Sequence, residues 1–501
     1  MGTGTFTQGL WKGEDPRCSY DPRRRVYYYV ENTPGGCWLY RSSSLVRLGE
    51  RRRMPAGFPL HAPVFVDYMN GASYHHWYAF GSNTWMCTGE DPFTDEWVCI
   101  GSLGITSWGI DHHVFQVQQP DGRGDWYLLW AGNGRKGDFG WGPESVYISR
   151  LLSPAQLAHP DALEENCVVH CRPHVAHPQP YPVPSDAPGS WKDVVAEAPF
   201  VVQKNGTVTI LYSGDGAQTV HYAMGLCFYA GEGDMEAGEN WIDYNASVKA
   251  DPEFSFDLER GVYGPGVAAV VSSPDGREDW MYYHTKMFST WNLQGGSEET
   301  QDSKEMWARR IQLQKIGWQE YRHSNGRVYT LPALGSPLPD GAEVPLPAGE
   351  SLPNGLPWKL EAEHMLPFGN IMGEAAQRVT GNSGGINLVR EICPHASYGG
   401  YCRWFDVLAD GAEEGCSGLY FHNVPAARRL TLAAGSPYTG AGFELWINGR
   451  HAGDIAVPET GGFDRFAPCS LEVSIPEMAT IALVYRRGKN QEAGVDYLLL
   501  E

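Results

Sequence analysis

Charged residues and long apolar runs are both scarce in this sequence of 501 residues. Only 19% of the residues are charged, whereas glycine (60), proline (35), tyrosine (26) and tryptophan (18) are abundant. This composition is typical of short strands and many turns, and it predicts an all-β chain. No apolar run approaches the ~20 residues that a membrane-spanning helix needs, so no membrane is expected as a partner. The length exceeds what one hydrophobic core organises and predicts at least two domains.

Basic residues are also few, since 38 Lys and Arg residues stand against 59 Asp and Glu residues and give a net charge of -21. Such a surface repels nucleic-acid phosphates and anionic membranes, and it suits a neutral ligand such as an oligo- or polysaccharide. Met1 leads straight into "GTGTFTQGLW", without the apolar core of a signal peptide. This favours the cytoplasm, and the alternative is a secreted protein whose leader has been removed.

The eleven cysteines include no Cys-x-x-Cys pair, and their odd number favours reduced residues over a disulfide framework. One segment, "CVVHCRPHVAHP", gathers ligand types that zinc accepts. Its flanking prolines and irregular spacing favour an ordinary loop instead. The residues concerned are Cys167, His170, Cys171, His174 and His177.

Five copies of one pattern follow one another along the first 330 residues. Each has a short leading strand, an aromatic-rich second strand and a third strand, and the leading segments begin near residues 13, 61, 109, 197 and 264. Repeats of this kind predict a five-bladed β-propeller over residues 1–330, with the leading strands innermost. Prolines mark residues 331–359 as a semi-rigid linker. Alternating apolar residues over 360–501 predict a β-sandwich of the jelly-roll type.

Three of the leading segments carry a carboxylate where the other two have His61 or Gly264, namely Asp15, Asp111 and Glu197. One acid before a proline is most simply a turn residue, but three at matching inner positions predict a site at the propeller axis. Sugar hydrolysis needs two carboxyl groups, one to protonate the leaving oxygen and one to activate water. A third carboxylate raises the pKa of the acid by like-charge repulsion. The expected sugar pocket is lined by Trp11, Trp108, His112, His113 and Phe115.

The ordered set "GEDP", "GIDHHVF", "PESVYISRLLSP", "AEAPFVVQKNGTVTILYSG" and "YGPGVAAVVSSPDGREDWMYYH" resembles glycoside hydrolase family 43. The resemblance implies that Asp15 is the general base, Asp111 a modulator of the acid's pKa and Glu197 the general acid. It further implies an exo-acting, inverting hydrolase with its working carboxyls ~6.5–9.5 Å apart and no cofactor for catalysis. An α-L-arabinofuranosidase acting on plant arabinan or arabinoxylan is expected. The alternatives are a β-D-xylosidase or other furanosidase, and a glycan-binding propeller without catalysis.

Three positions depart from the family pattern. Glu14 stands where the family has a small or apolar residue, so it could share or perturb the site. Val267 replaces the histidine of the family's Gly-Pro-Gly-His signature, which puts a calcium ion at the axis in doubt. Arg310 matches a fifth-blade arginine that reaches the sugar in relatives, although Arg309 could be that residue instead.

The C-terminal unit resembles a family 6-type carbohydrate-binding module through "LEAEHM", "ETGGFDRF" and "GVDYLLLE". The resemblance implies a structural calcium held by Glu361, Glu363 and Asp496, whose hard oxygen ligands would join the two chain ends of the unit. The alternative is a β-sandwich without sugar affinity that packs on the propeller. Its candidate aromatic residues for stacking on sugar are Tyr401, Trp404 and Phe405, which could equally be core residues.

Overall fold

The structure is a computed structural model, and each strand below belongs to the part of the chain that it describes. These residues are 4–13, 15–33, 36–54, 61–69, 72–79, 83–89, 91–94, 96, 98–105, 109–118, 124–132, 144–153, 156–161, 164–169, 195–214, 222–247, 252–286, 309–352, 355–369, 385–407, 416–486 and 489–501.

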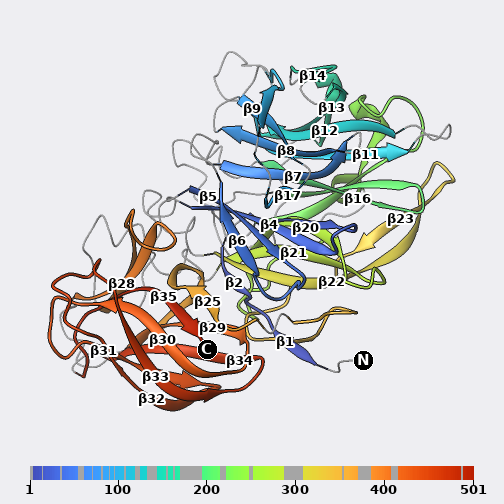
Figure 1. Ribbon diagram of the computed structural model, residues 1–501. Helices are drawn as coiled ribbons and strands as arrows, with labels where there is room; N and C mark the ends of the chain where they lie inside the picture. The colour runs from blue at the N-terminus through green and yellow to red at the C-terminus, as the bar shows by residue number, and fades with distance from the viewer. Residues whose placement is uncertain are drawn as a thin grey trace, which may run out of the picture.

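Five antiparallel sheets follow one another along the first two thirds of the chain (Figure 1). The first two contain β3 (Arg17–Asp21), β4 (Val26–Thr33), β5 (Gly36–Ser42) and β6 (Glu50–Arg53), then β7 (His61–Met69), β8 (Ala72–Ala79), β9 (Asn83–Gly89) and β10 (Val98–Ser102). The third contains β11 (Gly109–Gln118), β12 (Gly124–Gly132), β13 (Ser145–Ser153), β14 (Gln156–Leu157) and β15 (Cys167–Val169).

The fourth sheet contains β16 (Ala196–Lys204), β17 (Thr207–Gly214), β18 (Ala223–Tyr229) and β19 (Trp241–Asp243). The fifth contains β20 (Tyr263–Ser272), β21 (Asp279–Lys286) and β22 (Arg309–Arg322), and its outer strand is the N-terminal β2 (Trp11–Lys12). Short helices lie between these strands, namely η1 (Glu164–Asn166), η3 (Gly238–Asn240) and α1 (Tyr244–Ser247).

The leading strands of the five sheets form a closed ring. Strand β3 packs against β7, β7 against β11, β11 against β16, β16 against β20, and β20 returns to β3. The ring is fastened by β2, because Trp11 pairs with Ile311 and Lys12 with Arg310. Sheets that pack face to face around one axis form a β-propeller. The prediction of an all-β chain is thereby confirmed, and within the described residues no helix is long and apolar enough to cross a membrane.

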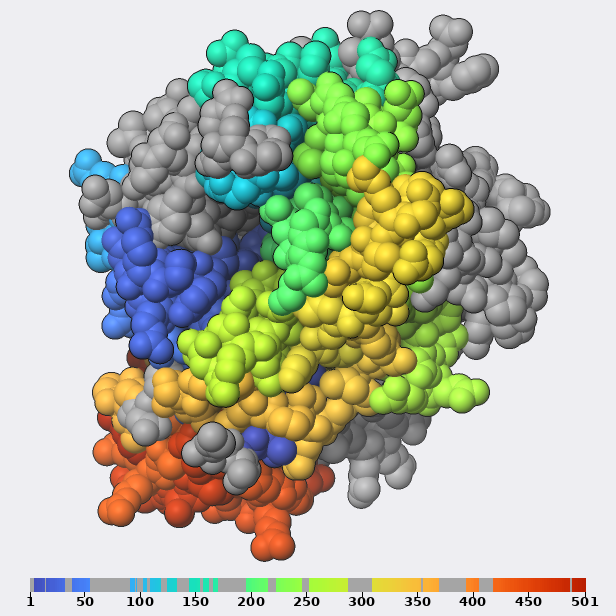
Figure 2. All heavy atoms as spheres, turned by 90° about the vertical axis from the view of Figure 1, so that its right-hand side faces the viewer, coloured from blue at the N-terminus to red at the C-terminus, as the bar shows by residue number. Residues whose placement is uncertain are grey.

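The segment after the ring stays attached to it. Strand β23 (Val328–Ala333) pairs with the end of β22, and β24 (Glu343–Pro345) pairs with β1 (Thr5–Thr7). The Glu350 carboxylate accepts a hydrogen bond from the Leu45 amide at 3.1 Å, and the Ala348 amide donates to Glu278 at 2.9 Å. Figure 2 shows this orange stretch between the yellow strands of the ring and the red-orange C-terminal unit.

The C-terminal unit consists of two antiparallel sheets. One contains β25 (Trp358–Glu361), β27 (Gly385–Ile392), β28 (Gly400–Val407), β30 (Ala427–Gly435), β33 (Ala467–Ile475) and β35 (Gly494–Leu500). The other contains β26 (Leu366–Gly369), β29 (Cys416–Val424), β31 (Gly442–Ile447), β32 (Arg450–Ala456) and β34 (Ala479–Arg486). The 3-10 helix η5 (Ala362–His364) connects β25 to β26.

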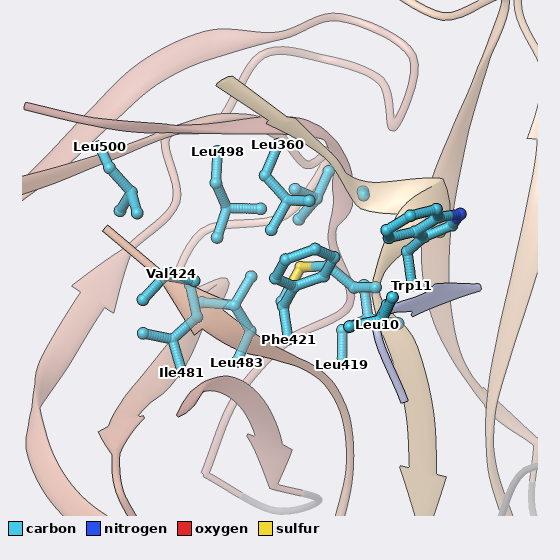
Figure 3. Packing of buried hydrophobic residues seen from close by; sticks show 14 of the residues in the cluster. Leu10, Trp11, Leu360, Leu419, Phe421, Val424, Ile481, Leu483, Leu498 and Leu500 are labelled. Atoms are coloured by element: carbon cyan, nitrogen blue, oxygen red, sulfur yellow. The ribbon is translucent and has the colours of Figure 1, made fainter. Parts of the chain in front are cut away.

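One hydrophobic cluster joins this unit to the propeller. Leu419 and Phe421 of β29 lie beside Leu10 and Trp11 of the N-terminal segment (Figure 3). The interface is also polar, because Glu31 of β4 lies 2.7 Å from His364 of η5. Buried apolar area of this kind stabilises a contact by roughly 25 cal/mol per Å². The two units are therefore expected to unfold together.

We expect Phe421→Ala to lower the free energy of unfolding by about 3–5 kcal/mol, the usual cost of removing a buried aromatic ring. Because the cluster is shared, the loss should appear in a single urea or thermal transition. Val328→Ala is the control, since this side chain is 47% exposed and its loss should cost less than ~0.5 kcal/mol. Two separated transitions, with only one moved by Phe421→Ala, would contradict the expectation.

Candidate active site

A bulge near the start of the leading strands turns side chains toward the axis. The pairing register shifts between Ile110 and His113 in β11, between Glu197 and Phe200 in β16, and between Gly266 and Ala269 in β20. The residue inside each bulge has a left-handed backbone, which is unusual for residues other than glycine. These residues are Asp111 (φ 54°), Ala198 (φ 51°) and Val267 (φ 55°), and Asp15 (φ 44°), just before β3, has the same conformation.

The bulge refines the predicted equivalence of the three carboxylates. Asp15 and Asp111 occupy the left-handed position, whereas Glu197 stands one residue before it, and Ala198 takes that position in β16. In sequence Glu14 precedes Asp15 in the same way, although Glu14 itself lies outside the described residues. Equal spacing in the repeat therefore does not mean that the three side chains occupy equal places.

Asp15 is surrounded by positive charge. Its Oδ1 accepts a hydrogen bond from Arg309 Nη1 at 3.1 Å and lies 3.5 Å from His284 Nδ1. Burial alone would raise the pKa of Asp15, but the hydrogen bond with His284 and the charges of Arg309 and Arg17 outweigh it and hold this pKa well below its usual range. Because 35% of the side chain remains exposed, water can reach an ionised carboxylate here.

Asp111 is held from two sides. Its Oδ1 accepts a hydrogen bond from Arg17 Nη2 at 3.0 Å, and its Oδ2 accepts one from the Ala198 amide at 2.9 Å. Arg17 belongs to β3 and Ala198 to β16, so this carboxylate connects the first, third and fourth sheets. The bond to the Ala198 amide also fixes the backbone next to Glu197. Asp111 is thus placed to orient Glu197 through the backbone of its neighbour Ala198.

Glu197 lies among neighbours opposite in character to those of Asp15. Its Oε1 accepts a hydrogen bond from the Tyr222 hydroxyl at 2.6 Å. Burial, followed by the negative charge of Asp111, raises its pKa to about 8, while the Tyr222 hydrogen bond acts in the lowering direction. At neutral pH this carboxyl therefore carries a proton, whereas Asp15 does not. The site brings together one proton donor and one proton acceptor.

A further acid near the site is Glu144, which directly precedes β13. The Glu144 carbonyl accepts a hydrogen bond from the Ala196 amide at 2.9 Å, which sets Glu144 beside the start of β16. One of its carboxyl oxygens is buried without a hydrogen-bond partner. Burial first, then the charges of Glu197 and Asp111, raise the pKa of Glu144 well above its usual range. A protonated Glu144 is neutral, so its charge neither raises nor lowers the pKa of Glu197.

Sequence reasoning missed several of these residues. Tyr222 stands at the head of "YAMGLCFYAG", His284 closes "DWMYYH", and Arg17 follows "GEDP". Each stands in or beside a repeat segment, but nothing in the repeat indicates that its side chain faces the axis. The sequence signal that could have indicated them is a polar residue at the end of an otherwise aromatic strand, such as His284.

Two predicted pocket residues are core residues. Trp11 is buried in the cluster between the propeller and the C-terminal unit, with its ring 5.2 Å from and edge-on to Tyr29. Phe115 is buried between the third and fourth sheets and stacks on Tyr127 at 5.5 Å. Both side chains alternate away from the axis because neighbouring strand residues face opposite sides. Their core packing does not support the prediction that they line a sugar pocket.

The other predicted pocket residues lie beside or beyond the described site. His112 and His113 are buried directly after Asp111, and His113 packs on Phe200 with ring centroids 4.4 Å apart. Their contact with sugar stays a prediction. Trp108 lies outside the described residues.

Arg310 does not face the carboxylates. Its Nη1 lies 3.0 Å from Asp340 of the linker, and its Nε donates to Thr285 at 3.3 Å. Arg309 faces Asp15 because adjacent residues of β22 point to opposite sides. The geometry favours Arg309, the alternative that the sequence left open, and contact of either arginine with sugar stays a prediction.

The described residues do not show the calcium site predicted for Glu361, Glu363 and Asp496. Glu361 Oε1 lies 2.5 Å from Arg51 of the propeller and 3.4 Å from Lys359, so cations already neutralise it. Asp496 accepts hydrogen bonds from the Ser397 amide at 2.9 and 3.2 Å. In the described part of the chain no group of three or more acidic, His or Cys side chains could hold a metal. Glu361 joins the C-terminal unit to the propeller through Arg51, and calcium binding by Glu361, Glu363 and Asp496 stays a prediction.

Two further expectations concern the remaining motifs. Cys167 is buried, and its thiol donates to the Val169 carbonyl at 3.5 Å; the four other residues of the zinc candidate lie outside the described residues. Tyr401 and Trp404 are buried, and Trp404 packs on Phe443 at 4.7 Å, so they are not available to stack on sugar. The side chain of Phe405 lies outside the described part.

Five antiparallel sheets thus form a propeller-type ring, and two carboxyls with oppositely shifted pKa values, Asp15 and Glu197, lie on its first and fourth sheets. A family model described as "Glycosyl hydrolases family 43" matches residues 12–321, and the chain belongs to this family of inverting glycosidases, whose catalysis needs no cofactor. The matched residues comprise most of the described ring. The carboxylates Asp15, Asp111 and Glu197 all fall within them.

Among curated proteins, the chain is 26% identical over 257 residues to "Alpha-L-arabinofuranosidase B" of Pyricularia oryzae, covering 50% of this chain and 43% of the relative. It is 24% identical over 257 residues to "Extracellular exo-alpha-(1->5)-L-arabinofuranosidase" of Streptomyces avermitilis, with the same two coverages, 50% and 43%. The chain thus spans less than half the length of these relatives. Among solved structures, an α-L-arabinofuranosidase from Lactobacillus brevis is 20% identical, covering 67% of this chain and 98% of that one, with a TM-score of 0.49.

The raised pKa of Glu197 makes stability depend on pH. Between its ordinary value of about 4.3 and about 8 in the fold, the folded state binds a proton that the unfolded state has lost. The free energy of unfolding therefore falls as pH rises through this window. We expect Glu197→Gln to remove this loss, so that the variant is more stable than wild type at pH 8 and similar at pH 4. Melting temperatures across this range test it, and an unchanged difference between the two proteins would contradict it.

Proposed function

We propose that this chain is an exo-acting α-L-arabinofuranosidase that hydrolyses its substrate in one displacement with inversion. The observation that carries the proposal is the opposite ionisation of two carboxyls at one axis. Asp15 is ionised beside Arg309 and His284, and Glu197 is protonated by burial and by Asp111. Two titratable groups whose environments separate their pKa values are suited to act as base and acid.

In the proposed reaction Asp15 is the general base. It takes a proton from water while the water oxygen forms a bond to the anomeric carbon. Glu197 is the general acid, and its proton goes to the glycosidic oxygen as that oxygen keeps the electron pair of the breaking bond. Asp111 orients the strand that carries Glu197 and favours the protonated form. The products are the sugar with inverted configuration and the freed alcohol.

The choice of sugar is supported by the similar proteins. Both curated relatives are named as α-L-arabinofuranosidases, and the second name specifies exo action on α-1,5 linkages. A plant arabinan or arabinoxylan is therefore the proposed substrate. The resemblance of the C-terminal unit to a carbohydrate-binding module stays a prediction, and the buried Tyr401 and Trp404 do not support it.

The central test is hydrolysis of nitrophenyl α-L-arabinofuranoside, nitrophenyl β-D-xyloside and arabino-oligosaccharides. Glu197→Gln should lose roughly 10²–10⁴-fold in kcat on the oligosaccharides, which need a protonated leaving group, and less on the nitrophenyl sugar. Glu232→Gln, a charge-matched change at an exposed residue, should have no effect. The configuration of the first product, followed by NMR, reports inversion.

The outcomes of this panel separate the hypotheses. Faster release of xylose than of arabinose would move the assignment to a β-D-xylosidase. No release from any glycoside, with glycan binding unchanged in Asp15→Asn and Glu197→Gln, would overturn the proposal in favour of a glycan-binding propeller.

Arg309 and Arg310 form a matched pair for testing the base. Arg309→Met removes a positive charge 3.1 Å from Asp15, so the pKa of Asp15 should rise. The acidic limb of the kcat/KM profile, where the base becomes protonated, should therefore move to higher pH. Arg310→Met, which removes an ion pair with Asp340 instead, should leave the limb in place. Equal shifts in both variants would contradict the assignment of Asp15.

A further inference from the structure

A chain of hydrogen bonds leads from the fifth sheet to Glu197. The Val267 amide donates to Ser213 Oγ at 2.9 Å, and Ser213 is the residue of β17 that pairs with Glu197 across the sheet. The Ser213 hydroxyl is hydrogen-bonded to Tyr222. Tyr222 Oη in turn donates to Glu197 Oε1 at 2.6 Å. Residues of the fourth and fifth sheets thus form a chain of hydrogen bonds that ends at one carboxyl oxygen.

The direction of this chain is fixed at its start. A backbone amide can only donate, so Ser213 accepts there and has its own proton free for Tyr222. Tyr222 then donates its single proton to Glu197. Burial, followed by the nearby Glu197, raises the pKa of the Tyr222 hydroxyl well above its usual range, so this proton stays in place. Oε1 of Glu197 is therefore always the acceptor.

We propose that Tyr222 is a positioning residue that occupies Oε1 of Glu197 and so places the acid's proton on Oε2, the oxygen that delivers it to the leaving group. This inference rests on the proposed role of Glu197 as general acid. A protonated carboxyl has one oxygen that carries hydrogen and one that accepts. Because Tyr222 takes the accepting oxygen, the proton has one location rather than two.

The hydrogen bond from Tyr222 also strengthens as negative charge develops on Glu197 during proton transfer. When the bond between Oε2 and hydrogen breaks, the proton forms a bond to the leaving oxygen and its electron pair stays on the carboxylate. A hydrogen bond to an ionised oxygen is roughly twice as strong as one between neutral groups. Tyr222 therefore stabilises Glu197 more after proton transfer than before it, which lowers the barrier rather than only the ground state.

The fifth sheet holds the Tyr222 ring in place. Gly266 has no side chain, and a Cβ there would lie 2.0 Å from Tyr222 Cε1. Val267 packs on Tyr222 together with Ala198, although a β-branched residue rarely adopts a φ of 55°. The His284 ring stacks on Tyr222 at 5.9 Å with an angle of 13° between planes, and Lys286 Nζ lies 5.0 Å from the ring centroid.

This packing gives the departure at Val267 a role. The strained backbone of Val267 points its amide at Ser213 and its side chain at the Tyr222 ring. His284 contacts Asp15 through Nδ1 and Tyr222 through its face, so one pair of stacked rings lies between the base and the acid. Strain kept by well-packed surroundings is common at functional sites.

The test is Tyr222→Phe, assayed with an unactivated arabino-oligosaccharide and with a nitrophenyl arabinoside. On the oligosaccharide kcat should fall roughly 10- to 100-fold, a part of what general acid catalysis contributes, with KM changed less than about threefold. On the nitrophenyl substrate, whose leaving group needs little protonation, kcat should fall less than about threefold. The hydrogen bond from Tyr222 lowers the pKa of Glu197, so its loss should raise this pKa. The alkaline limb of the kcat/KM profile, where the acid loses its proton, should therefore move to higher pH.

Tyr212→Phe is the matched control, since it removes another buried tyrosine hydroxyl of the same sheet, bonded to Asp243 at 3.1 Å. Tyr212→Phe should leave unchanged both the alkaline limb of the pH profile and the ratio of kcat on the two substrates. Gly266→Ala displaces the Tyr222 ring, and Ser213→Ala removes the hydroxyl that is hydrogen-bonded to Tyr222. Both variants should act in the same direction as Tyr222→Phe. These two variants decide the question if Tyr222→Phe does not fold.

An equal loss on both substrates with an unmoved alkaline limb would overturn the inference, because it would show a structural role only. No loss in any of the three variants would overturn it as well. Failure of the proposed function is separate. Full activity of Glu197→Gln on the oligosaccharide would refute the acid itself, whereas an inactive Glu197→Gln beside an unaffected Tyr222→Phe refutes only the role of Tyr222.

Discussion

The left-handed bulge of the leading strands is the constraint on which the site depends. A strand alternates its side chains between its two faces, so an unbroken strand could not hold successive residues at the axis. The extra residue of the bulge breaks this alternation at Asp111 and at the backbone beside Glu197, and Asp15 adopts the same left-handed conformation just before β3. A left-handed conformation costs a residue other than glycine roughly 1–2 kcal/mol. The closed ring of sheets supplies the packing that maintains it.

Charge is then distributed unevenly around the axis. Arg309 and Arg17 each bind one aspartate, while the hydrogen bond to Glu197 within the described residues comes from the neutral Tyr222 hydroxyl. Glu197 keeps its proton because a buried negative charge is costly and because Asp111 is negative. The difference between the proposed acid and the proposed base arises from burial and from neighbouring groups, not from the kind of acid. In a chain of net charge -21 these few buried cations have a large local effect.

The C-terminal unit supports the strand that carries Arg309 through contacts with the linker. Arg310 contacts Asp340 of the linker, and Tyr420 of β29 donates to the same carboxylate at 2.6 Å. Arg309, the residue before Arg310, contacts Asp15. The strand that positions the proposed base is thus held from behind by the second unit. The hydrophobic cluster around Trp11 also holds the C-terminal unit against the propeller.

The sequence by itself determined the all-β class, the five repeats and the carboxylates of the site, because strand periodicity and turn residues are local properties of the chain. Whether Trp11 or Arg309 reaches the axis depends on which face of a strand each occupies and on what packs against it. Neither follows from local pattern. Tyr222 and Val267 became meaningful only in the fold, since their partners lie on other sheets. Only the tertiary structure decided which carboxyl holds the proton, because a pKa is set by neighbours in space.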